Sequence, residues 1–208
     1  IFSDYIYLSS YECREEFYER YGIEKITDGF NDFVNILEKN DSIKKISINF
    51  SSLDENNVEI VKKFIIDNDL FKTIEISGVK FFDSSLEKLM KHINESNNIT
   101  TIKIFDVTKN ICDDYEKINK IIINNLETKN NIKTLNFINE IIDSDMDNIM
   151  LLLSNNKFLK KLDLSYNKLG DYAMELLGKY IEQNSELKCL DISNNEFGNQ
   201  GLKNFSYG

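Results

Sequence analysis

Hydrophobic residues recur along this chain in a fixed pattern, Φ-x-x-Φ-x-Φ, in which Φ is aliphatic or aromatic and most x positions are polar. The first members of six such triplets lie 28, 28, 33, 27 and 28 residues apart. The alternation within each triplet is typical of a strand with one buried face, and the period predicts a solenoid of strand–helix coils that bury their apolar sides against one another. The triplets are Ile43/Ile46/Ile48, Phe71/Ile74/Ile76, Ile99/Ile102/Ile104, Ile132/Leu135/Phe137, Leu159/Leu162/Leu164 and Leu187/Leu190/Ile192.

Helical spacing of apolar residues follows most of these triplets. After Asp54 the inward positions include Val58, Val61 and Ile65. An acidic residue at a helix start can cap free N–H groups and meets the positive end of the helix dipole. Because strands and helices alternate regularly, we expect all strands to be parallel. The other predicted helices follow Asp83, Asp113, Asp145 and Asp171.

Two stretches near the end of the chain carry a family resemblance. Residues Asn156 to Gly170 read NKFLKKLDLSYNKLG, and residues Asn184 to Gly198 read NSELKCLDISNNEFG. Both resemble units of the leucine-rich repeat family, in its ribonuclease-inhibitor-like subclass. In that family an asparagine three residues after the last triplet position hydrogen-bonds the turn backbone of adjacent coils, and Asn167 and Asn195 hold this place.

The resemblance covers about residues 40–208. It implies an α/β fold, a right-handed α/β solenoid (a leucine-rich repeat horseshoe) with a parallel sheet on the concave face and helices on the convex face. The first four coils are degenerate, because Ser51, Val79, Val107 and Glu140 stand in the asparagine place. Their turns must therefore satisfy their backbone groups in another way.

The regular pattern leaves three segments to interpret. No triplet fits residues 1–40, which we expect to form a helical N-terminal cap or a degenerate first repeat, followed by an array of about six repeats over 41–208. The step of 33 residues places an insertion near Thr108 to Asn110, either a local bulge or a contact loop. The stretch from Asn199 to Gly208 is too short for a full closing helix, so we expect the last repeat to be incomplete.

The composition of the chain limits the classes of partner that it can bind and the compartment in which we expect it. The net charge of −10 opposes nucleic acid as the main ligand and opposes an anionic membrane surface. No apolar run reaches the roughly 18 residues of a membrane span. Cys13, Cys112 and Cys189 are odd in number and far apart, which favours a reducing, cytoplasmic compartment. Because the chain begins at Ile1, a removed leader and hence secretion stay open as an alternative.

The x residues of each strand point away from the core and should line the concave face. Phe105 and Ile138 fall in the same column on adjacent coils, and Phe50 and Tyr166 lie one residue further along in their own coils. Exposed apolar residues among small polar ones are typical of the anchors of a protein interface. The alternative is that the turns or the inserted segment cover them.

Charged residues share the middle column of this face. Glu75, Lys103, Asp163 and Asp191 are the candidates for charge contacts with a partner. Asp163 and Asp191 could be read as a catalytic carboxylate pair, but no histidine, arginine or metal-ligand set accompanies them. The one histidine, His92, is expected on the outer side of its helix. We therefore expect no enzyme activity, no cofactor and no metal.

A row of lysines precedes the strands. Lys44, Lys72, Lys133, Lys160 and Lys188 occupy one repeat position, and Thr100 is the exception. Such a ridge could attract phosphate or an acidic partner, but a solvated strand edge is the better explanation.

These patterns predict a non-enzymatic protein-binding module or scaffold that binds a partner protein on its concave sheet, alone or as a subunit of a larger assembly. Relatives with such repeats suggest two alternatives. One is a regulator of an enzyme, of the small-GTPase activator or nuclease inhibitor type. An arginine finger is disfavoured because Arg14 and Arg20, in the N-terminal segment, are the only arginines. The other alternative is actin-filament capping.

Overall fold

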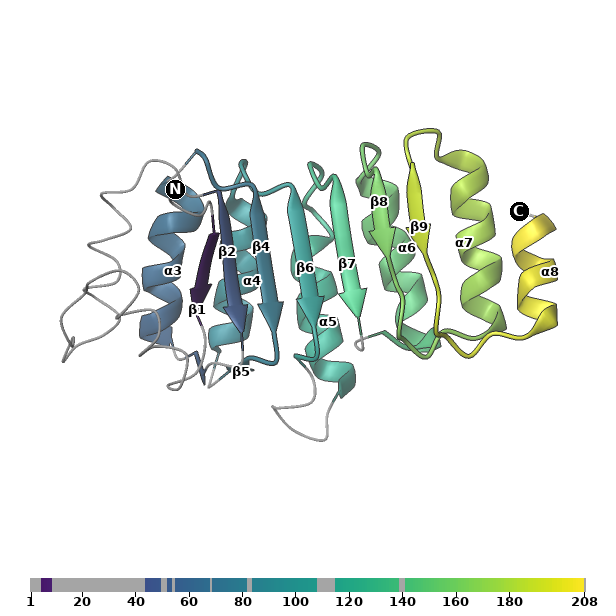
Figure 1. Cartoon of the computed structure of the whole chain (residues 1–208), viewed down its shortest axis with the longest axis horizontal. Coiled ribbons are helices and arrows are strands. Elements are labelled where there is room, and N and C mark those ends of the chain that lie inside the picture. The colour runs from purple at the N-terminus through teal and green to yellow at the C-terminus, as the bar shows by residue number, and fades with distance from the viewer. Residues whose placement is uncertain are drawn as a thin grey trace.

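Seven parallel strands form one sheet in the order β1-β2-β4-β6-β7-β8-β9 (Figure 1). The computed structural model describes residues 5–8, 44–49, 52–53, 55–67, 69–81, 84–107, 115–138 and 141–207. The sheet strands are β1 (Tyr5–Leu8), β2 (Lys45–Asn49), β4 (Thr73–Ser77), β6 (Thr101–Phe105), β7 (Thr134–Ile138), β8 (Lys161–Asp163) and β9 (Cys189–Asp191). A small second sheet pairs β3 (Ser52–Leu53) with β5 (Lys80–Phe81).

The helices lie together on one face of this sheet, and each packs beside the next along the array (Figure 1). They are α3 (Glu55–Asp67), α4 (Ser85–Glu95), α5 (Tyr115–Leu126), α6 (Met146–Asn155), α7 (Asp171–Gln183) and α8 (Asn199–Tyr207), with a 3₁₀ turn η2 (Asp143–Asp145) before α6. The alternation of parallel strands and helices confirms the predicted α/β solenoid, with the sheet on one face and the helices on the other.

The triplets form the core, as predicted. From Phe71 to Leu164 every triplet residue is at most 1% exposed. In the last coil the same positions, Leu187, Leu190 and Ile192, are only half-buried. The difference follows from stacking, because β9 is an edge strand with a neighbour on one side only.

An edge strand appears in the N-terminal segment, where no triplet was recognised. β1 pairs in parallel with β2, so that Ile6 stands opposite Ile46 and Leu8 opposite Ile48. The pattern is hidden in the sequence because Ser3 stands where the first apolar residue of a triplet would be. The other residues of the expected cap, and the insertion near Thr108 to Asn110, lie outside the described residues.

The prediction that the C-terminal stretch is too short for a closing helix was wrong. Residues Asn199–Tyr207 form α8, which packs along α7. Gly178 permits the close approach, since a Cβ atom there would lie 2.7 Å from the carbonyl oxygen of Phe205. Phe197 and Phe205 then pack against the core and cover part of the open end.

The predicted asparagine ladder is present in the last two coils. The Oδ1 of Asn167 accepts a hydrogen bond from the Ile141 N–H (2.9 Å), and its Nδ2 donates to the carbonyls of Phe137 and Leu164 (2.7 and 2.8 Å). Asn195 repeats this arrangement one coil later, with the Leu169 N–H as its donor (3.0 Å). Each side chain therefore joins two coils through their turn backbones.

The earlier coils join their turns through backbone hydrogen bonds without an asparagine, and the last two coils make the same bond as well, from the Tyr166 N–H to the Ser193 carbonyl (2.9 Å). Val79 and Val107 fill the asparagine place as buried apolar residues. The Gly78 N–H donates to the Phe105 carbonyl (2.9 Å), and the Asp106 N–H donates to the Ile138 carbonyl (3.3 Å). β4, β6 and β7 are five residues long. β8 and β9 end after three residues, and beyond that point the asparagine side chain donates hydrogen bonds to the backbone carbonyls.

Two acidic residues near helix starts, Asp143 and Asp171, cap the next coil, whereas Asp145 accepts from the Ile142 N–H of its own coil. Asp143 Oδ1 accepts from the backbone N–H groups of Gly170 (2.8 Å) and Ala173 (3.3 Å) at the start of α7. Asp171 Oδ1 accepts from Gly198 and Gly201 (both 2.8 Å) at the start of α8. Free N–H groups at one helix start thus find their acceptor in the preceding coil, which ties each helix to the next.

Replacing Asp171 by alanine should lower the free energy of unfolding by about 1–2 kcal/mol, because two N–H groups at the start of α8 lose their acceptor. Asp171→Asn should lose less, since its Oδ1 can still accept. Urea unfolding followed by circular dichroism measures both. Glu175→Ala on the same helix, which removes an exposed pair with Lys179, is the control, and an equal loss there would contradict the capping role.

Replacing Asn167 by valine should lower the free energy of unfolding by about 3 kcal/mol, although valine stands at this place in earlier coils. The Ile141 N–H and the Phe137 carbonyl would lose this partner at a buried site, whereas the Leu164 carbonyl would keep Asn195 Nδ2. Asn195→Val is the matched control: Asn195 is itself only half-buried, so the loss should be clearly smaller. Equal losses in urea unfolding would argue against burial as the cause.

Candidate functional site

The concave face is built from the alternate strand residues that point away from the helices. β4, β6 and β7 share one burial pattern, in which buried positions alternate with half-buried ones. Their register places Glu75 beside Lys103 and Phe105 beside Ile138. The predicted columns therefore run across the sheet as expected from the sequence.

Glu75 lies at the centre of a charge cluster on this face. Its carboxylate is 2.8 Å from the Lys45 ammonium on β2 and 3.8 Å from the Lys103 ammonium on β6. The Lys45 and Glu75 side chains are each 17% exposed, so the pair is partly shielded from water. Because opposite charges already meet here, this part of the face presents little net charge to a partner.

Asp163 and Asp191 are neighbours in the register of β8 and β9. Each carboxylate, however, accepts hydrogen bonds from the residues that follow its own strand. Asp163 accepts from the Ser165 backbone N–H and hydroxyl (3.0 and 2.7 Å) and from Asn136 Nδ2 (3.0 Å). Asp191 accepts from Ser193 in the same way, and these hydrogen bonds lower the pKa of its carboxyl below the ordinary value. A carboxylate stabilised in its charged form is poorly suited to act as a general acid.

Three of the four predicted anchors lie within the described structure. Phe105 and Ile138 are half-buried and are direct neighbours at the ends of β6 and β7. Tyr166, just beyond β8, is 58% exposed. Phe50 lies outside the described residues. The three described anchors therefore share the edge of the sheet where the strands end.

One backbone position after the strands is left-handed in each of four coils. Its φ is 56° at Gly78, 53° at Asp106, 56° at Tyr166 and 56° at Asn194. Glycine, aspartate and asparagine tolerate this conformation, whereas a tyrosine is disfavoured there. Tyr166 is thus the one residue of this set whose type the turn does not favour.

The prediction that His92 lies on the outer side of its helix was wrong. The side chain is buried between α3 and α4, with Nε2 3.5 Å from Glu59 and Nδ1 3.6 Å from Glu95. The helical spacing of Leu89 and Ile93 marks the side that faces the sheet. In a solenoid the flanks of a helix are covered as well, by the helices of adjacent coils.

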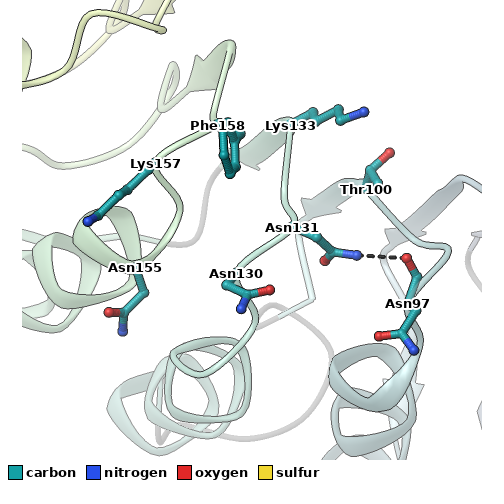
Figure 2. Close-up of a pocket in the computed structure, with 8 residues that line it drawn as sticks. All are labelled: Asn97, Thr100, Asn130, Asn131, Lys133, Asn155, Lys157 and Phe158. Atoms are coloured by element: carbon teal, nitrogen blue, oxygen red, sulfur yellow. Dashed lines mark hydrogen bonds between the residues drawn. The ribbon is translucent and has the colours of Figure 1, made fainter.

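Sequence reasoning missed a groove at the opposite edge of the sheet, where the strands begin (Figure 2). Its volume is about 580 Å³, and the turns before β6, β7 and β8 contribute to it. Its lining is made of Asn97, Thr100, Asn130, Asn131, Lys133, Asn155, Lys157 and Phe158. A signal was present in the sequence: Phe158 stands directly before a triplet, where Asn98, Asn131 and Glu186 are polar.

A buried lysine supports one of these turns. Lys129 is 3% exposed, and its Nζ donates to the Ser96 carbonyl at the end of α4 (2.6 Å). Burial lowers the pKa of this ammonium from 10.5 to about 8. The carbonyl end of α4 favours the positive charge, and the loss of water around it opposes the charge.

The described residues hold no group of three or more histidine, cysteine, aspartate or glutamate side chains that could bind a metal ion. No helix among them is long and apolar enough to span a membrane.

Lys129 should make stability depend on pH above neutrality. Since its pKa is lower in the folded state, the unfolded chain binds more protons between about pH 8 and 10.5, and stability rises with pH in that window. The free energy of unfolding of the wild type minus that of Lys129→Met should therefore increase between pH 7 and about pH 10. Urea unfolding at both pH values measures the difference, and Lys120→Met, an exposed change on α5, is the control. A difference that does not change with pH would contradict this role for Lys129.

Comparison with known proteins agrees with this architecture. A family model described as Leucine Rich repeat matches residues 155–178 and 183–206, the two segments that contain Asn167 and Asn195. No curated protein matches the sequence. An internalin from Listeria monocytogenes has a similar solved structure, with 19% identity and a TM-score of 0.39 over 84% of this chain and 47% of the internalin, so the chain spans about half of that protein's length. Its strand–helix coils and the matched segments identify this protein as an α/β solenoid containing leucine-rich repeats.

Proposed function

We propose that this protein is a non-enzymatic binding module whose partner is another protein. Leucine-rich repeats generally serve as protein-interaction modules, and a solenoid presents an extended, rigid concave surface that loses little entropy on binding. Helices of 10–13 residues in five of the coils support assignment to the ribonuclease-inhibitor-like subclass. The exposed free thiol of Cys189 supports a reducing, cytoplasmic location.

The backbone conformation and exposure of Tyr166 are the main evidence for the position of the binding site. A tyrosine at φ 56° costs about 1–2 kcal/mol relative to a right-handed or extended backbone, and the side chain recovers none of this in the core because it is 58% exposed. Asn194 takes the equivalent place in the next coil at less strain. A residue that the turn disfavours and the core does not use is best explained by a contact outside the chain.

Phe105 and Ile138 extend this contact along the same edge. They are adjacent in the register, and Ser77 stands beside Phe105 on β4, while Ser165 holds the corresponding repeat position after β8. Two large apolar side chains between serines form a local apolar patch, which gains binding energy when a partner removes it from water.

Charged side chains around the anchors would set the partner's orientation. Lys103 lies on β6, the strand of Phe105, Glu75 lies on the neighbouring β4, and Asp163 and Asp191 continue the same column. Since each of these groups already has a partner within the chain, we assign them to the polar rim, where charges contribute more to specificity than to affinity.

The test is affinity capture from native lysate with mass spectrometry, comparing the wild type with Tyr166→Asn. Asparagine suits the left-handed turn, so the variant should be as stable as the wild type or more stable by up to about 1 kcal/mol, yet its partner should be lost. Gain of stability with loss of binding is the expected signature.

Two further variants complete this test. Phe105→Ala combined with Ile138→Ala should lose the same partner. Tyr172→Asn changes a 45% exposed tyrosine on α7, on the helical face, and should retain it. If a partner remains bound to both Tyr166→Asn and the double variant, the site does not lie at the strand ends.

A further inference from the structure

The groove at the start of the strands is a second surface, separate from the proposed concave site. Tyr166 follows β8, whereas Phe158 precedes it, so the two lie at opposite edges of the sheet. Figure 2 shows Phe158 and Lys133 extending from neighbouring turns on the same side of the groove.

Phe158 is exposed at a position where the repeat accepts polar residues. Its side chain is 64% exposed, the highest value among the exposed large hydrophobic residues of the described structure. The equivalent residues in other coils are Asn98, Asn131 and Glu186, with Leu70 as a second apolar case. A single exposed ring is common on protein surfaces, but this ring lines a groove beside two cations.

The groove is locally basic in a protein of net charge −10. Lys133 and Lys157 line it, and none of the described lining residues is acidic. Within the described part of the chain neither ammonium makes an ion pair. Lys157 is also a departure from the repeat, since Asn97 and Asn130 hold its place in the two preceding coils. The groove therefore offers two cations to an external anion.

Asparagine side chains fix the shape of the groove. The Asn131 Nδ2 donates to the Asn97 carbonyl (2.8 Å), and the Asn155 Nδ2 donates to the Glu127 carbonyl (2.9 Å). These bonds join the turns of successive coils, so the groove needs little reorganisation on binding. Asn130 is exposed in the lining and has a carboxamide that can pair with the backbone of an extended peptide.

We propose that this groove binds an acidic peptide segment of a partner protein, with one apolar side chain packed on Phe158 and carboxylates paired with Lys133 and Lys157. Charge complementarity selects the acidic segment, and the exposed ring requires an apolar group within it. Nucleic acid fits less well, because its affinity depends on many phosphate contacts, and a protein of net charge −10 repels a long polyanion.

The experiment selects ligands from a display library of random peptides of about 12 residues on the intact protein. Counter-selection uses a variant that carries Phe158→Asn, Lys133→Thr and Lys157→Asn. Each replacement is the residue that another coil has at the same position (Asn131, Thr100 and Asn130), so the variant should keep the fold, as thermal unfolding will verify. We expect enrichment of sequences in which Asp or Glu flank an aromatic or aliphatic residue.

The affinity of an enriched peptide is then measured by fluorescence anisotropy at about 150 mM salt. Phe158→Asn and Lys157→Asn should each weaken binding by about tenfold or more. Lys188→Thr is the matched control, because it makes the same change as Lys133→Thr at the same repeat position but outside the groove, and it should change affinity by less than about twofold.

Several results would overturn the proposal. Selection of neutral or basic peptides would show that the groove has no preference for acidic segments. The same conclusion would follow if every selected peptide also bound the triple variant used for counter-selection. Competition by single-stranded DNA of about 12 nucleotides would make it a general polyanion site. Self-association of the wild type that the triple variant abolishes, measured by analytical ultracentrifugation, would assign the groove to a second copy of the chain.

Discussion

Each coil of this protein buries its apolar residues only against the coils on either side, and the rest of the structure depends on this constraint. A strand–helix unit of about 28 residues cannot enclose its own triplet, so burial of the triplets to 1% exposure or less requires a coil on both sides. The half-buried triplet of the last coil shows what happens when one side is open. α8 covers part of that side because Gly178 lets its backbone come close to α7.

Polar groups, like the apolar core, find their partners in an adjacent coil. Asn167 bonds to the backbone of two coils, and Asp143 and Asp171 bond to the helix start of the next coil. Where valine stands in place of the asparagine, the strands are longer and the turns keep the backbone bonds that the regular coils also make. Both solutions leave few buried groups unpaired, so the degenerate coils can stack in register with the regular ones.

The most regular part of the array also displays the clearest departures from it. The coil that contains Asn167 matches the family model, yet it exposes Phe158 before its strand and Tyr166 after it. Most other coils have polar or turn-forming residues at these two positions, with Leu70 and Phe50 as the apolar exceptions, so the fold does not require an aromatic side chain at either position. Residues that a repeat does not need are the ones most easily attributed to binding, and here they define two surfaces at opposite edges of one sheet.

The sequence by itself determined the period, the six triplet strands and their helices, and the parallel sheet, because a side chain's local spacing decides which face it buries. The role of Asn167 and Asn195 followed from the family resemblance of their two segments. The sequence did not reveal β1, where Ser3 hides the triplet, or α8, which depends on contact with α7. The burial of His92, the capping of one helix by the preceding coil and the groove around Phe158 were likewise decided by tertiary structure. Most of these features arise between residues about 25 to 40 positions apart, and only the stacking of the coils brings such residues into contact.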